Sequence, residues 1–167
     1  MDIKKILFPT DFSDAKDAVL MLATSLARDC GATLLIVHVE EPPMAYGRGE
    51  MYYGTLGPTR AELRGMLEEI HPSDPVVAYE HHLISGAPAS ALVAFATEKV
   101  VDLIIMGTHG RTGLMNMLMG SVAEAVVRRA PCPVLTYRPP AEEASKDLML
   151  SRSLNQNALL QELKDES

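Results

Sequence analysis

Two kinds of hydrophobic pattern alternate along the chain. Short runs of mostly branched apolar residues are typical of strands that are buried on both faces. Segments in which apolar residues recur every three or four positions are typical of amphipathic helices. The short runs predict five strands, at residues 3–8, 32–39, 76–84, 100–106 and 133–138. Helices are predicted between them: one after Ser13, one over 59–70, one after Pro88 and one over 122–130.

This βαβαβαβαβ order predicts an α/β fold with a five-stranded parallel sheet, helices on both faces and right-handed crossovers. In such a sheet, ligands bind beyond the carboxyl ends of the strands, where the strand order reverses. The residues expected at those ends are Pro9–Asp11, Val39 and Met106–Gly107. They are the first candidates for a binding site.

The limits of the first helix are marked by residues that favour helix ends. Ser13 is a candidate N-cap, because its hydroxyl can accept a hydrogen bond from a free amide of the first turn. Arg28 is expected in the last turn, and Gly31 is expected just beyond it, where the left-handed conformation is common. The helix predicted over 59–70 contains Gly65, which is a weak helix former.

Two segments lie outside the alternation. Residues 40–58 are rich in proline, glycine and tyrosine and predict a long loop, in which 46–57 is a candidate lid. Pro139 and Pro140 end the predicted domain, which therefore covers residues 1–140. Residues 141–167 are acidic and contain regularly spaced leucines, so we expect a helical or partly disordered C-terminal extension. It would either lie on its own domain or serve as an arm for a protein partner.

The composition fits one globular domain, because 47% of the 167 residues are hydrophobic. No apolar run approaches the roughly 20 residues that span a bilayer, and the N-terminus lacks a signal peptide, so we expect a cytoplasmic protein without membrane contact. The formal net charge of −7 argues against a nucleic-acid surface. Cys30 and Cys132 lack metal-ligand spacing and are expected to be reduced packing thiols.

A glycine-bearing loop follows the fourth predicted strand. It runs from Gly107 to Gly120 and leads into the helix that starts with Ser121. Glycine lets backbone N–H groups approach a ligand closely, and a helix start adds unpaired N–H donors and the positive end of the helix dipole. Together they predict an anion site, most simply for phosphate. The chain has no GxxxxGK[ST] motif, and no GxGxxG motif follows its first strand, so a P-loop or dinucleotide site is not expected.

The spacing Gly107-x2-Gly110-x9-Gly120-Ser121 resembles the nucleotide-binding signature of the universal stress protein family. The opening strand with its Pro9-Thr10-Asp11 loop, and the segments after Asp102 and around Pro131, are similar to the same family. The resemblance runs from about Met1 to Arg138, and residues 41–56 are much less typical. It implies a Rossmann-like sheet of the adenine nucleotide alpha hydrolase type, in which the first, second and fourth strands meet at one crevice.

The resemblance also implies a ligand, ATP or another adenine nucleotide, with Mg²⁺ held through its phosphates. The phosphates would be surrounded by Gly107, Gly110, Gly120, Ser121 and Val122. The adenosine would be flanked by Pro9, Thr10 and Asp11. The Val39 backbone would bind the adenine edge, and Met106 would lie against the nucleoside. His109 and Arg111 are candidates for phosphate contact, although both could equally face water. No catalytic residue is predicted.

Three other histidines are expected to be uninvolved in ligand or metal binding. His38 lies inside a strand and is expected to be packed in the core. His81 and His82 are consecutive in a strand, so their side chains point to opposite faces and form a poor metal clamp.

The function implied is that of an ATP-binding, nucleotide-dependent regulator of the stress response. The resemblance implies a homodimer formed through the last strand, Val134–Arg138, whose edge groups can pair with a second copy. The alternative is a slow ATPase or nucleotide-transferring enzyme that uses the same crevice, for which Asp11 is the acidic candidate. A third possibility is a scaffold that works through residues 141–167.

Overall fold

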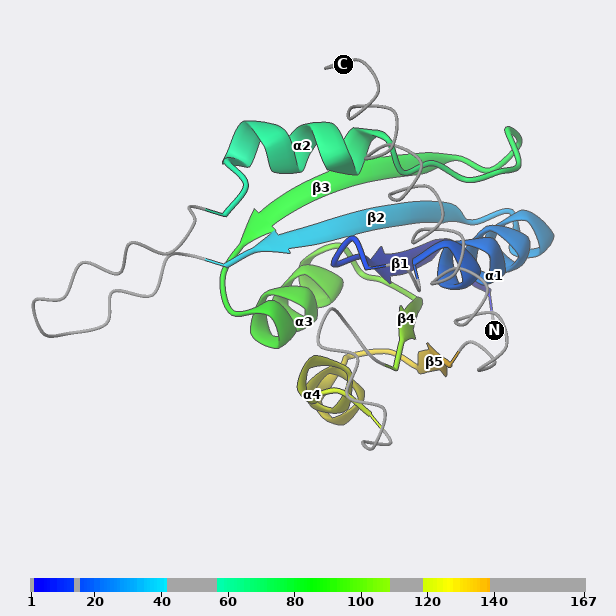
Figure 1. The fold of residues 1–167 in the computed structure, drawn as a ribbon. Helices are drawn as coiled ribbons and strands as arrows, with labels where there is room; N and C mark the ends of the chain where they lie inside the picture. The colour runs from blue at the N-terminus through cyan, green and yellow to red at the C-terminus, as the bar shows by residue number, and fades with distance from the viewer. Residues whose placement is uncertain (1, 14–15, 42–56, 109–118, 139–167) are drawn as a thin grey trace, which may run out of the picture. The chain divides into compact units, whose positions relative to one another are not determined.

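The computed structural model describes residues 2–13, 16–41, 57–108 and 119–138. The described elements all belong to one compact unit, Met1–Tyr137. In chain order they are β1 (Lys5–Pro9), α1 (Lys16–Cys30), β2 (Thr33–Glu40), α2 (Arg60–Glu68), β3 (Tyr79–Ser85), α3 (Pro88–Glu98), β4 (Leu103–Gly107), α4 (Ser121–Arg129) and β5 (Val134–Tyr137) (Figure 1).

The five strands form one parallel sheet in the order β3-β2-β1-β4-β5. The predicted α/β fold is therefore confirmed, and β1 lies in the centre with β2 and β4 as its neighbours. The chain moves from β1 to β2 and β3 on one side, and β4 and β5 are added on the other side. The strand order thus reverses between β1 and β4, which is where the fold class binds ligands.

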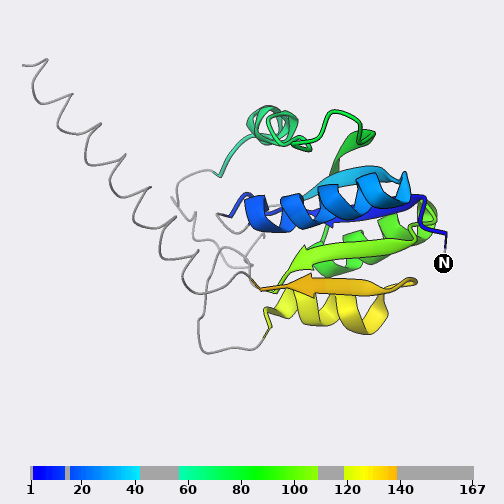
Figure 2. The same ribbon diagram turned by 90° about the vertical axis from the view of Figure 1, so that its right-hand side faces the viewer.

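Helices cover both faces of the sheet (Figures 1 and 2). Side chains alternate along each strand. Ile6 and Phe8 therefore join one core with Val19 of α1. Leu7 of the same strand joins the opposite core with Leu92 of α3. The first core also contains α2 residues and the second contains α4 residues, so each face is covered by two helices.

Capping residues mark the end of α1, as expected, and the start of α2, where no cap was predicted. Gly31 has a φ of +64°, and its N–H donates to the carbonyl of Arg28 at 3.2 Å, as expected for the residue after α1. Thr59 is the N-cap of α2 rather than its first residue, and it forms a capping box with Glu62. None of the helices in the described part of the chain combines the length and apolar character of a bilayer-spanning segment.

The predicted starts of the third and fourth strands are wrong by about three residues. β3 begins at Tyr79, because Asp74 folds the preceding residues into a turn: its carboxylate and carbonyl accept the N–H groups of Val76 and Val77. β4 begins at Leu103, because Val100 adopts a positive φ of 53° and lies outside the sheet. Val76 and Val100 are apolar but 82% and 74% exposed, so hydrophobicity alone extended both predicted strands too far.

Candidate functional site

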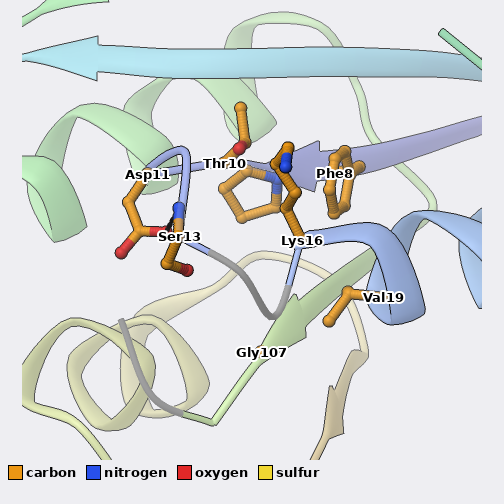
Figure 3. Close-up of a pocket in the computed structure, with 8 residues that line it drawn as sticks. Phe8, Thr10, Asp11, Ser13, Lys16, Val19 and Gly107 are labelled. Carbon is orange, nitrogen blue, oxygen red and sulfur yellow. Dashed lines mark hydrogen bonds between the residues drawn. The ribbon is translucent and has the colours of Figure 1, made fainter. Parts of the chain in front are cut away.

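A pocket lies at the carboxyl ends of β1 and β4, at the point where the strand order reverses. One wall is Phe8–Asp11, which comprises the end of β1 and the first residues after it. Ser13, Lys16 and Val19 extend this wall along the start of α1, and Gly107 of β4 lies across from them (Figure 3). Four residues predicted for the site, Pro9, Thr10, Asp11 and Gly107, are therefore brought together although nearly 100 residues separate them in the sequence.

Proline at position 9 accounts for the opening between the strands. The pairing of β1 with β2 continues to Pro9 and Val37, whereas its pairing with β4 extends only to Leu7 and Ile104. The N–H of Ile104 donates to β5, at the Pro133 carbonyl, so the backbone groups of the next residue, Ile105, face β1. A proline opposite that carbonyl has no N–H to donate. The ladder between β1 and β4 therefore lacks the bond that would follow the Leu7–Ile104 pair, at the point where both strands reach the pocket.

The loop after β1 is held by hydrogen bonds at each residue. The Thr10 N–H donates to the Val37 carbonyl at 2.9 Å, and the Phe12 N–H donates to Thr10 Oγ1 at 3.1 Å. The Ser13 N–H donates to Asp11 Oδ1 at 3.1 Å, so Asp11 forms an Asx turn with one of its two carboxylate oxygens. This bond fixes one oxygen of the Asp11 side chain, and Asp11 is one of the residues that line the pocket (Figure 3).

His38 of β2 is buried, as expected for a core histidine, with 7% of its surface exposed. It has a second feature that the sequence did not indicate, because its Nδ1 lies 2.8 Å from the carbonyl oxygen of Thr10 in the pocket loop. The other two strand histidines hold different partners. His81 Nε2 contacts the carbonyl of Ile70, and His82 Nε2 contacts the carboxylate of Glu80. Among the described residues, no group of three metal-binding side chains comes together.

The start of α4 is tied to the end of β4. The Thr108 N–H donates to the Tyr137 carbonyl of β5, and the Thr108 carbonyl accepts the N–H of Gly120 at 2.7 Å. Gly120 is the N-cap of α4, and the first bond within the helix runs from Glu124 N–H to the Gly120 carbonyl. The N–H of Gly120, which the family resemblance implied would bind a phosphate, thus has a backbone partner. The amides without a partner inside the helix are those of residues 121–123, among which Ser121 and Val122 were predicted.

Val39 and Met106 do not line the pocket. Met106 is buried, with 6% of its surface exposed, and packs in the core formed with α3 and α4. Val39 packs against the same core, but its backbone points toward β1. The N–H of Thr33 donates to β1 and that of Leu34 toward β3, so odd-numbered residues of β2 face β1. Since β1 ends at Pro9, the Val39 backbone faces the region beyond the strand end, and its predicted contact with an adenine edge stays a prediction.

Several predicted features lie outside the described residues: His109, Gly110, Arg111, the candidate lid and the extension 141–167. Four residues of the described pocket were not among the predicted site residues: the apolar Phe8 and Val19, and the polar Ser13 and Lys16. Ser13 and Lys16 both line it, and Lys16 brings the positively charged side chain of the described lining. Ser13 and Lys16 could have been predicted to line the pocket because they follow the Pro9–Asp11 loop closely in sequence. A chain that leaves the end of a strand and enters a helix stays near that strand end.

Comparison with known proteins connects this geometry to a family. The universal stress protein family model matches residues 2–138. A universal stress protein of Methanocaldococcus jannaschii is 34% identical over 145 residues, which cover 84% of this chain and 85% of that protein.

Two solved structures share the fold. A universal stress protein from Lactobacillus plantarum superimposes with a TM-score of 0.65 at 22% identity, over 83% of this chain and 99% of that chain. A universal stress protein crystallised in complex with cAMP superimposes with a TM-score of 0.62 at 25% identity, over 84% and 100% of the two chains. With the family match covering most of its length, the chain belongs to the universal stress protein family.

Proposed function

We propose that this protein binds ATP, or another adenine nucleotide, at the pocket between β1 and β4 and acts as a nucleotide-dependent regulator of a cytoplasmic stress response. One observation carries the proposal. The Pro9–Asp11 loop and Gly107 line the same pocket, and the Thr108–Gly120 hydrogen bond holds the start of α4 next to the end of β4. A loop suited to a nucleoside and a helix start suited to phosphate therefore lie at one edge of the sheet, which supports the proposal.

Each part of a nucleotide finds matching chemistry at this edge. The first-turn amides of Ser121, Val122 and Ala123, which have no partner inside the helix, suit phosphate oxygens, and the ammonium group of Lys16 adds a positive charge at the pocket. The Asp11 carboxylate suits a ribose hydroxyl or a water bound to Mg²⁺, which the phosphates would bring with them. The Val39 backbone faces the region beyond the end of β1, which supports the proposed contact with the adenine edge. The relative solved with cAMP, an adenine nucleotide, supports the ligand class.

The direct test is to extract the purified protein with acid, identify any released nucleotide, and titrate nucleotide-free protein with ATP and Mg²⁺. Gly120→Val should abolish binding by placing a branched side chain beside the phosphate site. The backbone at Gly120 has φ −71° and ψ 155°, which valine adopts readily, so the variant should fold. Gly65→Val, in α2 and with open space around the added side chain, is the matched control. ATP affinity equal to wild type in Gly120→Val would refute the assignment.

An enzymatic role in the same pocket is the second candidate, because Asp11 is the one carboxylate among the described residues that line it. Hydrolysis requires a group that positions the attacking water. A single-turnover assay with radiolabelled ATP separates the two functions. Product that forms in wild type and disappears in Asp11→Ala favours the enzyme, and bound ATP that remains intact over hours favours the regulator.

We also propose that two copies associate through β5. This strand lies at the edge of the sheet, and Leu135 is 39% exposed. The carbonyls of Pro133 and Tyr137 accept bonds from β4, so the backbone groups of Thr136 face the open edge. Thr136→Pro should therefore remove an outward N–H without disturbing the β4 ladder and should convert the dimer to a monomer in light scattering. A monomeric wild-type protein at micromolar concentration would contradict the proposal.

A further inference from the structure

His38 contacts both residues that flank Asp11. Its Nδ1 lies 2.8 Å from the carbonyl oxygen of Thr10, and its imidazole ring lies 4.2 Å from the ring of Phe12, between centroids, at a tilt of 37°. A carbonyl oxygen only accepts hydrogen bonds, so Nδ1 carries the hydrogen and donates it. One buried side chain therefore holds the residue before Asp11 through a hydrogen bond and the residue after it through ring packing.

The loop needs such support because its backbone is strained at Phe12. This residue has a φ of +63°, a conformation that costs energy for a bulky side chain and persists only where the surroundings enforce it. The Phe12 N–H bonds Thr10 Oγ1, and the Ser13 N–H bonds Asp11 Oδ1. These bonds form within the loop itself, whereas the contacts of His38 connect the loop to the rigid strand β2.

A histidine bonded to a backbone carbonyl could have a purely structural role, and the same molecule contains such a case. His81 Nε2 lies 2.6 Å from the carbonyl oxygen of Ile70, in the segment between α2 and β3, and its ring contacts Tyr79. None of these residues lines the pocket. The difference is that His38 holds the two neighbours of a pocket carboxylate.

We infer that His38 is a positioning residue of the nucleotide site, which fixes the Thr10–Phe12 turn and thereby directs the Asp11 carboxylate toward the ligand. The inference rests on the proposed function for its ligand and on the loop contacts for its geometry. Loss of the hydrogen bond should let the strained turn relax and should move Asp11 out of position, without unfolding the sheet.

Three variants distinguish the contribution of the His38 hydrogen bond from that of its ring and from the effect of removing any buried histidine. His38→Phe keeps a buried ring but loses the donor. His38→Asn keeps a donor at the place of Nδ1 but loses most of the ring. His81→Phe removes the comparable bond far from the pocket and is the control. The first readout is the exchange rate of the backbone N–H groups of Phe12 and Ser13, which needs no ligand. We expect exchange at least about 10-fold faster in His38→Phe, a smaller change in His38→Asn and none in His81→Phe.

The second readout is a double-mutant cycle on ATP affinity with Asp11→Asn. We expect His38→Phe alone to weaken ATP binding roughly 10-fold, the loss expected for one buried hydrogen bond. In the Asp11→Asn background the same change should cost less than about twofold, because the carboxylate it positions is already absent. Additive losses, or unchanged affinity in His38→Phe, would overturn the inference. Unchanged amide exchange would overturn it whatever the ligand result, whereas a wild-type protein that binds no nucleotide would refute the proposed function alone.

Discussion

Pro9→Ala tests whether a single proline keeps β1 and β4 apart at the pocket. Alanine would supply an N–H opposite the Ile105 carbonyl, so that the ladder could extend past its present end at Leu7 and Ile104. One backbone hydrogen bond stabilises a protein by about 0.5–1.5 kcal/mol. Losing the proline restriction on the unfolded chain costs about 0.4–1 kcal/mol. The two effects oppose each other, so the free energy of unfolding should stay within about 1 kcal/mol of wild type.

The affinity for nucleotide should fall, although stability hardly changes. A ligand that enters between the strands would have to break the added bond, which weakens binding by the same 0.5–1.5 kcal/mol, about 2- to 13-fold. Loss of the Pro9 ring from the pocket wall acts in the same direction. Calorimetric titration with ATP and Mg²⁺ measures the affinity, and urea denaturation measures the stability. The exchange rate of the new amide at position 9 reports directly whether the ladder has closed.

Pro133→Ala is the control for this experiment. Pro133 is exposed and precedes β5, and the bond it makes to β4 uses its carbonyl, which alanine retains. This variant should show the loss of proline rigidity without a change in affinity. If the amide at position 9 exchanges as fast as an unprotected peptide and the affinity equals that of wild type, proline is not what separates the strands.

Lys16→Gln should weaken ATP binding about three- to tenfold at low salt, because a positive charge near the phosphates is lost, and the effect should be smaller at high salt. Equal weakening of ATP binding by Lys4→Gln, at the opposite end of β1, would contradict this reasoning. Thr59→Ala should lower the free energy of unfolding by about 1 kcal/mol by removing the N-cap of α2, measured by urea denaturation. Backbone N–H groups of Lys4 and Lys5 donate to the Asp102 carboxylate and hold its pKa below the usual value. The ionised carboxylate therefore stabilises the fold at pH values above the unfolded-state pKa of about 3.9. This stabilisation is lost as the pH falls through the lower pKa of the folded state. Asp102→Asn should therefore flatten the decline of stability in acid, and an acid denaturation curve parallel to that of wild type would exclude this explanation.

The fold could be predicted because the central strands obey simple rules. The middle of β2 is buried on both faces, so its sequence is a near-continuous apolar run interrupted by His38. The predicted strand at 32–39 differs from Thr33–Glu40 by one residue at each end. The helix after Ser13 was recognisable from its spacing and from Gly31 at its end. A pocket at the carboxyl ends of β1 and β4 could be expected from the chain order, because residues at the carboxyl ends of neighbouring parallel strands converge.

Other features depend on contacts that a linear pattern does not contain. The Gly120 N–H donates to the Thr108 carbonyl, so the amides that lack a partner inside the helix begin at Ser121, one residue further along than expected. Nothing in the spacing of the glycines indicates this. The Val100 turn was hidden because an exposed valine looks the same in sequence as a buried one. For His38, burial could be predicted from its place in a strand, whereas its partner, 28 residues away, could not.

The two ends of the sheet are built from opposite kinds of residue. At the amino ends of β1 and β4, the Asp102 carboxylate accepts the N–H groups of Lys4 and Lys5 and joins the two strands. At the carboxyl ends, Pro9 interrupts the same ladder. A folded domain retains such local violations where a ligand must enter, provided that the rest of the fold compensates. Substitutions that close the ladder near the pocket should therefore reduce affinity more than stability, and substitutions at Asp102 should do the reverse.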